Sequence, residues 1–186
     1  MKLKLTLLFV VLAGAIVFLV FRKDILSYQS VRAVDASTTG VISNESLLNY
    51  FKTSLLVDYR GAKPSYDFAS IDSHDRVIVH LWASWCAPCV NEVPDLIAFA
   101  KRENVKSPGK TVFITVSLDE GSDDLNKFLK SFPDFDTDRF VRVWDKGGGV
   151  SKLLDADRLP MTVMIERGKA EPRVVRGVVD WKTTGF

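Results

Sequence analysis

Two cysteines three positions apart, Cys86 and Cys89, are the residues of this chain whose type and spacing most directly suggest chemistry. They are the only cysteines among 186 residues, and they lie in the stretch WASWCAPC, residues 82–89. Such a pair is compatible with half of a zinc site, a haem attachment, a structural staple or a redox-active disulfide. The surrounding residues discriminate among these four possibilities.

The sequence lacks the ligands that a zinc site or a haem attachment needs. A structural zinc site takes four ligands, and the chain has no second cysteine pair, while its two histidines, His74 and His80, both precede the first one. Haem attachment requires a histidine directly after the second cysteine, and that position is Val90. A disulfide that closes so short a loop constrains the unfolded chain little, which disfavours a structural staple. Redox chemistry is the interpretation that remains.

The position of the pair between two predicted elements supports redox chemistry. The apolar run Arg76–Ala83 predicts a strand covered on both faces, and a helix is predicted from Ala87 to Glu103. Cys86 would cap that helix, where unpaired N–H groups and the helix dipole stabilise a thiolate, and Pro88 fits its first turn. We therefore predict that Cys86 is the exposed nucleophile and that Cys89, one turn deeper, is the buried resolving thiol.

Predicted strands and helices alternate along the rest of the chain, which is typical of an α/β fold with a parallel sheet. Further strands are predicted at residues 111–117, 139–144 and 161–166, and the last of these opens a hairpin that turns through Gly168. Further helices are predicted at residues 44–56, with Ser43 or Asn44 as cap and Leu55 on the apolar face, at 122–132, with Ser122 as cap, and at 149–156. The hairpin adds an antiparallel edge, so we predict a three-layer sandwich around a central mixed sheet.

The N-terminal segment Leu5–Phe21 carries no charge and has lysines before it and Arg22 and Lys23 after it. As a helix it would be about 26 Å long, enough to span a bilayer core. A cleaved signal peptide is the alternative, but the run is long for one and no small-x-small site follows closely. We predict a membrane anchor in residues 1–23, a tether in 24–43 and a globular domain in 44–186. The slight excess of positive charge before the segment predicts a single-pass protein of the cell inner membrane whose domain faces the periplasm or extracytoplasmic side.

The residues around the cysteines resemble the thioredoxin superfamily, and in particular its membrane-anchored TlpA/ResA/CcmG-like thiol–disulfide oxidoreductases. The resemblance rests on VIVHLWASWCAPCVNEVPDL, ITVSLDEGSDDLNKFLKSF and RLPMTVMIERGKA, and covers roughly residues 65–182. It implies a thioredoxin-like fold after a transmembrane helix, and no cofactor besides the disulfide. It also implies reduction of exported protein disulfides, such as those of apocytochrome c, with electrons from a transmembrane thiol carrier.

The resemblance assigns roles to individual residues. Glu92 matches an acid that tunes the buried thiol and accepts its proton, and the alternative is a surface carboxylate near a helix start. Pro160 matches a cis-proline that abuts the CxxC loop, and the alternative is a trans proline in a turn. Trp85, Ala87, Pro88 and Pro160 would together form the substrate-docking face.

Two positions depart from the family's pattern. His80 stands where thioredoxin has a buried acid and where the anchored branch often has asparagine. It is either a buried neutral histidine with one hydrogen-bond partner or a proton relay to Cys89. Family domains usually end in a helix after the hairpin, whereas only KTTGF follows Trp181. We therefore expect a shortened last helix and a sheet face that is partly uncovered.

The direction of electron flow stays open at this point, because Ala-Pro between the cysteines does not determine it. A disulfide-forming oxidase is the enzymatic alternative, and a Cu(I)-binding metallochaperone that uses both thiolates is the alternative from another class. Related copper carriers add a distal histidine, and none follows Cys89, so we expect no metal. A net charge of +2 without a long basic stripe argues against nucleic-acid binding.

Overall fold

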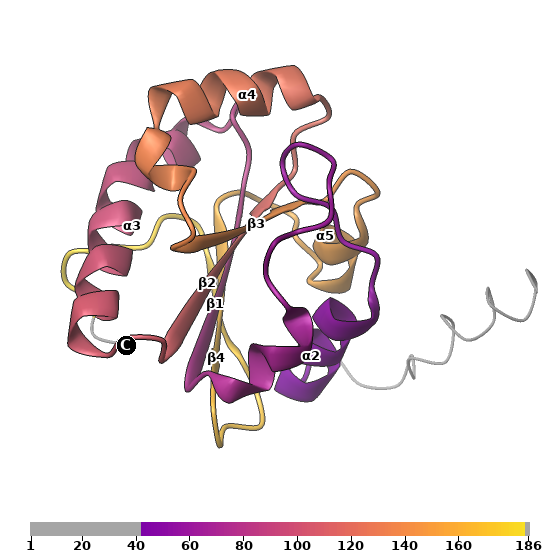
Figure 1. Ribbon diagram of the computed structural model, residues 1–186, viewed down its shortest axis with the longest axis vertical. Helices are drawn as coiled ribbons and strands as arrows, with labels where there is room; N and C mark the ends of the chain where they lie inside the picture. Colours follow the sequence, from indigo (N-terminus) through magenta and orange to yellow (C-terminus); the bar gives the residue numbers. More distant parts are fainter. Residues whose placement is uncertain (1–41, 185–186) are drawn as a thin grey trace, which may run out of the picture. The chain divides into compact units, whose positions relative to one another are not determined.

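The computed structural model describes residues 42–184, which form a five-stranded mixed sheet with helices on both faces (Figure 1). The predicted anchor at Leu5–Phe21 and most of the predicted tether lie outside the described residues. Within residues 42–184, no helix is long and apolar enough to cross a membrane. The α/β architecture predicted for the domain is confirmed.

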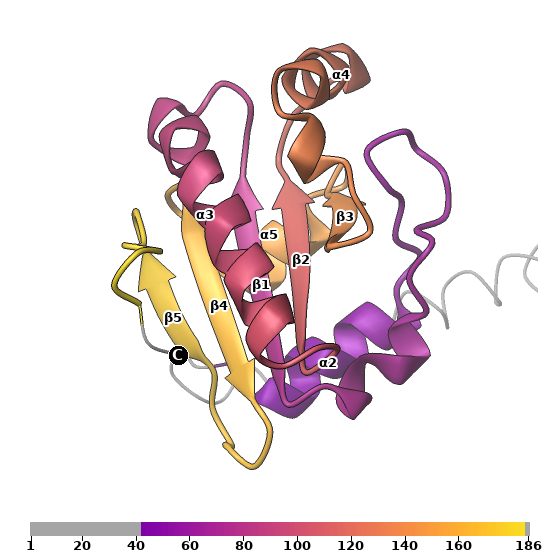
Figure 2. The same cartoon turned by 60° about the vertical axis from the view of Figure 1, so that its left-hand side comes forward.

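The sheet has the strand order β3-β2-β1-β4-β5. The central strands β1 and β2 are parallel, as are β2 and β3, whereas β4 runs antiparallel to β1 and pairs with β5 through the predicted hairpin (Figure 2). Gly168 has a φ of 83° in the hairpin turn, a conformation that favours glycine. The strands are β1 (Arg76–Trp82), β2 (Thr111–Ser117), β3 (Phe140–Trp144), β4 (Met161–Glu166) and β5 (Arg173–Arg176).

Helices α3 and α4 cover one face of the sheet, and α2 and α5 cover the other (Figure 1). Two apolar cores result, one on each face, which is the three-layer arrangement predicted from the alternation of strands and helices. The helices are α2 (Asn44–Thr53), α3 (Ala87–Lys106), α4 (Ser122–Ser131) and α5 (Gly149–Leu153), with short 3₁₀ turns η1 (Phe68–Ser73) and η2 (Pro133–Phe135).

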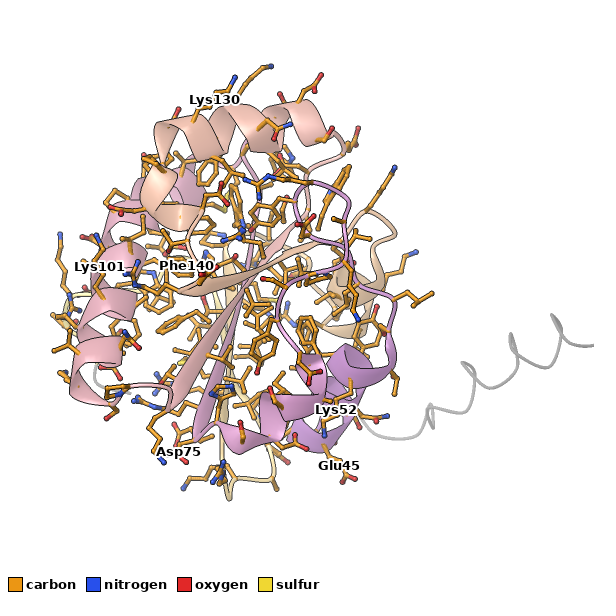
Figure 3. All side chains as sticks on the ribbon, viewed as in Figure 1. Glu45, Lys52, Asp75, Lys101, Lys130 and Phe140 are labelled. Carbon is orange, nitrogen blue, oxygen red and sulfur yellow. A yellow bond between two sulfur atoms is a disulfide. The ribbon has the colours of Figure 1, made fainter. Side chains whose placement is uncertain are left out.

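Strand β1 contributes side chains to both cores, since successive residues of a strand point to opposite faces. Val77, Val79 and Leu81 pack in the core beneath α2 and α5, whereas Ile78 and Trp82 pack beneath α3 and α4. His80 shares the face of Ile78 and Trp82 by this alternation, which directs its ring toward α3. Charged side chains such as those of Lys101 and Lys130 point outward from the helices, while Phe140 lies inside (Figure 3).

Two expectations about helix ends were wrong. Gly121, not Ser122, is the N-cap of α4 and makes no side-chain cap bond, because the helix begins one residue earlier than a Ser122 cap requires. Leu55 is fully exposed, because α2 ends at Thr53. Near the end of the described chain, Trp181 is buried against Phe99, with ring centroids 5.3 Å apart, whereas Val174 and Val178 are exposed.

Candidate active site

Cys86 and Cys89 form a disulfide at the amino end of α3, with Cα atoms 5.2 Å apart. Strand β1 ends at Trp82, and the chain turns back so that the N–H of Cys86 donates to the carbonyl of Ala83. Cys86 is the N-cap of α3, as predicted, and its sulfur accepts a hydrogen bond of 3.3 Å from the N–H of Cys89. The same N–H would stabilise a thiolate on Cys86 after reduction.

The two sulfurs differ in access, although less than predicted. Cys86 is only 6% exposed, so the expectation of an openly exposed nucleophile was wrong, because flanking loops cover most of its side chain. Cys89 has no exposed surface. Cys86 is thus the cysteine of the pair that a partner can reach.

A groove of about 470 Å³ adjoins Cys86. Three of the residues predicted to form the docking face lie on it, and Trp85 among them is 68% exposed, which is unusual for so large an apolar side chain. Trp82, in contrast, is fully buried in the core. The groove is mostly apolar, and its lining residues are Trp85, Cys86, Ala87, Pro88, Leu118, Ala156, Asp157, Arg158 and Leu159.

Pro160 follows the last residue of this lining and is preceded by a cis peptide bond, as the family resemblance implied. Its ring is buried, and its carbonyl accepts a hydrogen bond of 2.8 Å from the N–H of Gly177. The segment before Pro160 therefore lies beside the CxxC loop, where Leu159 lines the groove together with Cys86.

Asp119 anchors the loop that carries the cysteines, a contact that the sequence analysis missed. Its buried carboxylate accepts hydrogen bonds from the Ser84 N–H at 3.0 and 3.1 Å, from the Ser84 hydroxyl at 2.6 Å and from the Ser117 hydroxyl at 2.7 Å. Its position two residues after a buried strand, at the edge where β1 also ends, is the sequence feature that could have revealed it. The carboxylate thus ties the Ser84–Cys86 turn to the end of β2.

Replacing Asp119 by alanine is expected to lower the free energy of unfolding by about 2 kcal/mol, because the partly buried Ser84 N–H loses its carboxylate acceptor. The Ser84 amide should also exchange with solvent faster, and amide hydrogen exchange with urea denaturation measures both effects. Asp119→Asn, which keeps one oxygen, should recover part of the loss. Unchanged exchange at Ser84 in the alanine variant would show that the carboxylate does not hold the loop.

Glu92 lies one turn beyond Cys89 on α3 and is only 4% exposed, so the alternative of a surface carboxylate is wrong. Its Oε2 accepts hydrogen bonds from the N–H of Val179 at 3.1 Å and from Nε1 of Trp181 at 3.2 Å. Its Oε1 lies 3.3 Å from Nε2 of His80. The segment after β5 therefore closes over Glu92 and removes it from water.

His80 is also buried, between Glu92 on one side and Thr162 on the other. Its Nδ1 lies 3.0 Å from the Thr162 hydroxyl oxygen. Burial lowers the pKa of His80 to about 3, and burial raises the pKa of Glu92 to about 7 against the opposing effect of its bonds from Val179 and Trp181. Both side chains are therefore mainly uncharged just below neutral pH.

The fold brings most of the predicted site residues to one end of the sheet. Cys86, Ala87, Pro88 and Trp85 surround the groove, and Cys89 and Glu92 occupy successive turns of α3. His80 reaches Glu92, and no contact between His80 and Cys89 is found within residues 42–184. Within that part of the chain there is no cluster of three or more His, Cys, Asp or Glu side chains arranged to hold a metal ion.

A redox disulfide at the start of a helix, beside a cis-proline on a mixed sheet, defines the class of thioredoxin-like thiol–disulfide oxidoreductases. Residues 74–170 match the sequence profile of the family described as Thioredoxin-like, and the chain belongs to this family. It is an oxidoreductase that works through its own Cys86–Cys89 disulfide and needs no further cofactor.

Individual relatives support this assignment. Thioredoxin 1 of Plasmodium falciparum is 33% identical over 98 residues, which are 52% of this chain and 84% of that protein. The DsbE thiol:disulfide interchange protein of Chlorobium tepidum is 25% identical, with a TM-score of 0.53 over 67% of this chain and 81% of that one. A secreted disulfide oxidoreductase of Mycobacterium tuberculosis, homologous to E. coli DsbE, has the same fold, with 18% identity and a TM-score of 0.56 over 73% of this chain and 87% of its own.

Proposed function

We propose that this protein reduces disulfides of exported proteins. The observation that carries the proposal is the asymmetry of the cysteine pair. Cys86 borders a groove that an extended segment of a partner can enter, whereas Cys89 is fully buried behind it with Glu92 one turn further on. One cysteine is placed to attack a partner, and the other is placed to attack the first.

The reaction proceeds in two exchanges. The thiolate of Cys86 attacks a partner disulfide, forms a mixed disulfide and releases one partner sulfur as a thiolate, which takes a proton from solvent. Cys89 then gives its proton to the Glu92 carboxylate and attacks the Cys86 sulfur. The Cys86–Cys89 disulfide forms, and the second partner sulfur leaves as a thiolate. Two electrons pass from the protein's dithiol to the partner, and the Cys86–Cys89 disulfide must then be reduced by a separate thiol donor before another turnover.

The surroundings of Cys86 favour the reducing direction. A strong oxidant stabilises its dithiol form, mainly through a stabilised thiolate. Here the sulfur lies in a mostly apolar groove and accepts one backbone N–H bond. The cation that lines the groove, Arg158, has 65% of its side chain in solvent, where water screens its charge. An apolar site disfavours the thiolate, and so it favours transfer of electrons to the partner.

The reduction potential of the Cys86–Cys89 pair tests the direction. We expect a value closer to the roughly −270 mV of a reducing thioredoxin than to the roughly −120 mV of a strong oxidase. Equilibration with glutathione or dithiothreitol buffers, read by thiol alkylation, measures the potential. A reduction potential near that of a strong oxidase would contradict the proposal and favour the alternative, an enzyme that introduces disulfides.

We further propose that the domain works outside the cytoplasmic membrane, anchored through Leu5–Phe21. The proposal is supported by the charge-free length of that segment and by its basic flanks. In an oxidising compartment a dithiol must be regenerated, so a transmembrane thiol carrier is the proposed electron donor. Apocytochrome c, whose haem-binding cysteines must be reduced, is a candidate partner. The secreted M. tuberculosis relative is in keeping with this location.

A further inference from the structure

Two buried polar atoms face each other between β1 and α3. Nε2 of His80 and Oε1 of Glu92 are 3.3 Å apart, and within residues 42–184 neither atom has another hydrogen-bond partner. The two side chains are 2% and 3% exposed. The separation is slightly longer than an ordinary N–H···O hydrogen bond. Each atom therefore depends on the other for its hydrogen bonding.

The remaining polar atoms of the pair are already engaged. Glu92 Oε2 accepts from Val179 and Trp181, and both of these groups only donate. His80 Nδ1 contacts the Thr162 hydroxyl, which is able either to donate or to accept. A neutral imidazole also has two forms, with its proton on Nδ1 or on Nε2. The hydrogen-bonded group of Thr162, His80 and Glu92 thus has two arrangements in which every facing polar atom is bonded. The two arrangements differ in the protonation of Glu92.

We propose that His80 is a positioning residue that changes tautomer with the protonation state of Glu92. When Glu92 is ionised, His80 Nε2–H donates to Oε1 and Nδ1 accepts from the Thr162 hydroxyl. When Glu92 is protonated, its O–H donates to Nε2, and Nδ1–H donates to Thr162. The ring stays neutral in both states, so the buried carboxyl gains or loses a proton without leaving an unpaired group.

This inference concerns the proton step of the proposed function and rests on it only for its catalytic consequence. When the disulfide closes, the proton of Cys89 passes to the carboxylate, and the electron pair of its S–H bond enters the new S–S bond. The hydrogen-bonded group of Thr162, His80 and Glu92 gains that single proton, and the charge of the group changes from negative to neutral. His80 thereby allows Glu92 to be an acceptor in the dithiol form and a neutral acid in the disulfide form.

The other ionisable groups packed around the pair are directed elsewhere. Arg102 on α3 donates to the carbonyl of Trp181, and Asp95 on α3 pairs with Lys182 at the surface. Asp180 is exposed and accepts bonds within its own turn. Tyr59, in the same core, bonds the Trp82 indole and the carbonyl of Thr115, and burial raises the pKa of its hydroxyl, which stays neutral. These groups leave the His80–Glu92 contact as the direct pairing of two titratable side chains at this site.

The tautomer of His80 tests the proposal directly in the oxidised protein, without any exchange reaction. Nitrogen NMR of histidine-labelled protein distinguishes the two tautomers and the imidazolium, and His74→Gln assigns the second histidine. Below about pH 7 we expect Nδ1–H, and above it Nε2–H, with the change following the protonation of Glu92. In Glu92→Gln, whose amide N–H always faces Nε2, the ring should stay in the Nδ1–H form. A constant tautomer in the wild type, or an imidazolium near pH 6, would overturn the proposal.

Substitutions on either side of the ring give a second readout, the pH midpoint of the Glu92 carboxyl stretch in infrared difference spectra. His80→Phe removes the donor to the carboxylate and should raise the midpoint by about one pH unit. Thr162→Val leaves Nδ1 without a donor or acceptor, which favours the Nε2–H form, because an unpaired acceptor costs less than an unpaired N–H donor. This variant should therefore lower the midpoint.

Thr115→Val is the matched control, because Thr115 flanks His80 on the other neighbouring strand and its hydroxyl bonds Val141 instead. Its midpoint should not move. Opposite shifts for His80→Phe and Thr162→Val support the tautomer change, and shifts of the same sign, or none, overturn it. If His80→Phe fails to fold, the comparison of the Glu92 midpoint in Thr162→Val with that in Thr115→Val still tests the proposal: a lower midpoint in Thr162→Val supports it, and equal midpoints overturn it. A high reduction potential of the Cys86–Cys89 pair would reject the proposed direction of electron flow. It would not change the outcomes expected for the His80 tautomer and the Glu92 midpoint.

Discussion

The Cys89→Ser protein is expected to accumulate as a covalent mixed disulfide with its partner through Cys86. Removing the resolving thiol leaves the first exchange intact and blocks the second, so the adduct has no internal route to release. Cys86→Ser should form no adduct, because Cys89 has no exposed surface through which a partner disulfide could be attacked. Its exchange rate with a model disulfide should fall by at least about a thousandfold.

Non-reducing electrophoresis and mass spectrometry of proteins captured in the native envelope measure this trapping. The Cys86→Ser/Cys89→Ser double variant controls for non-covalent capture. Equal trapping by the two single variants would contradict the assigned roles and would mean that the groove beside Cys86 is not the entry point. The captured proteins also identify the substrates, and apocytochrome c among them would support the proposed partner.

Glu92→Gln is expected to change how stability depends on pH. The folded-state pKa of Glu92 is raised from 4.5 to about 7, so its carboxyl contributes stability that is fully present below pH 4.5 and is lost as the pH rises through 7. Glutamine keeps the hydrogen bonds of the protonated acid and has no proton to lose. From about pH 4.5 to 8 the variant should therefore gain on the order of 3 kcal/mol relative to the wild type.

Urea denaturation of the oxidised proteins at several pH values measures this difference. The pKa of His80 is lowered by burial to about 3, so His80 costs stability as the pH falls below 6.5, but it does so in both proteins and cancels. Glu120→Gln, at an exposed carboxylate near the same end of the sheet, should show no comparable trend. Parallel curves for Glu92→Gln and the wild type would mean that Glu92 is ionised in the fold at neutral pH.

The same substitution should also slow the release of the mixed disulfide. Glutamine is unable to accept the proton of Cys89, and loss of a positioned base typically costs about a hundredfold or more in rate.

Much of the fold was predictable from local patterns. Strand β1 and helix α3 follow from an almost continuous apolar run and from helical spacing of apolar residues, and the order of elements around them indicates an α/β sandwich. The pairing of Cys86 with Cys89 needs only three positions of separation at a helix start. The cis bond before Pro160 was expected from family resemblance alone, since no local pattern requires it.

The contacts that define the chemistry of the site join residues that are far apart in the sequence. His80 meets Glu92 and Thr162, and Ser84 meets Asp119, across 12, 82 and 35 positions of the sequence. Such contacts depend on strand register, since a shift of one residue would turn His80 to the opposite core.

The sequence by itself therefore determined the class of chemistry, because a cysteine pair between a buried strand and a helix has few other uses. Only the tertiary structure decided how little of Cys86 is exposed and what surrounds the buried acid. Loops from β2, β4 and the segment after β5 close over the site, and their burial of Glu92 and His80 shifts both pKa values toward the neutral forms. Glu92 and His80 are buried because segments distant in the sequence pack together, so no single stretch of the sequence predicts their burial.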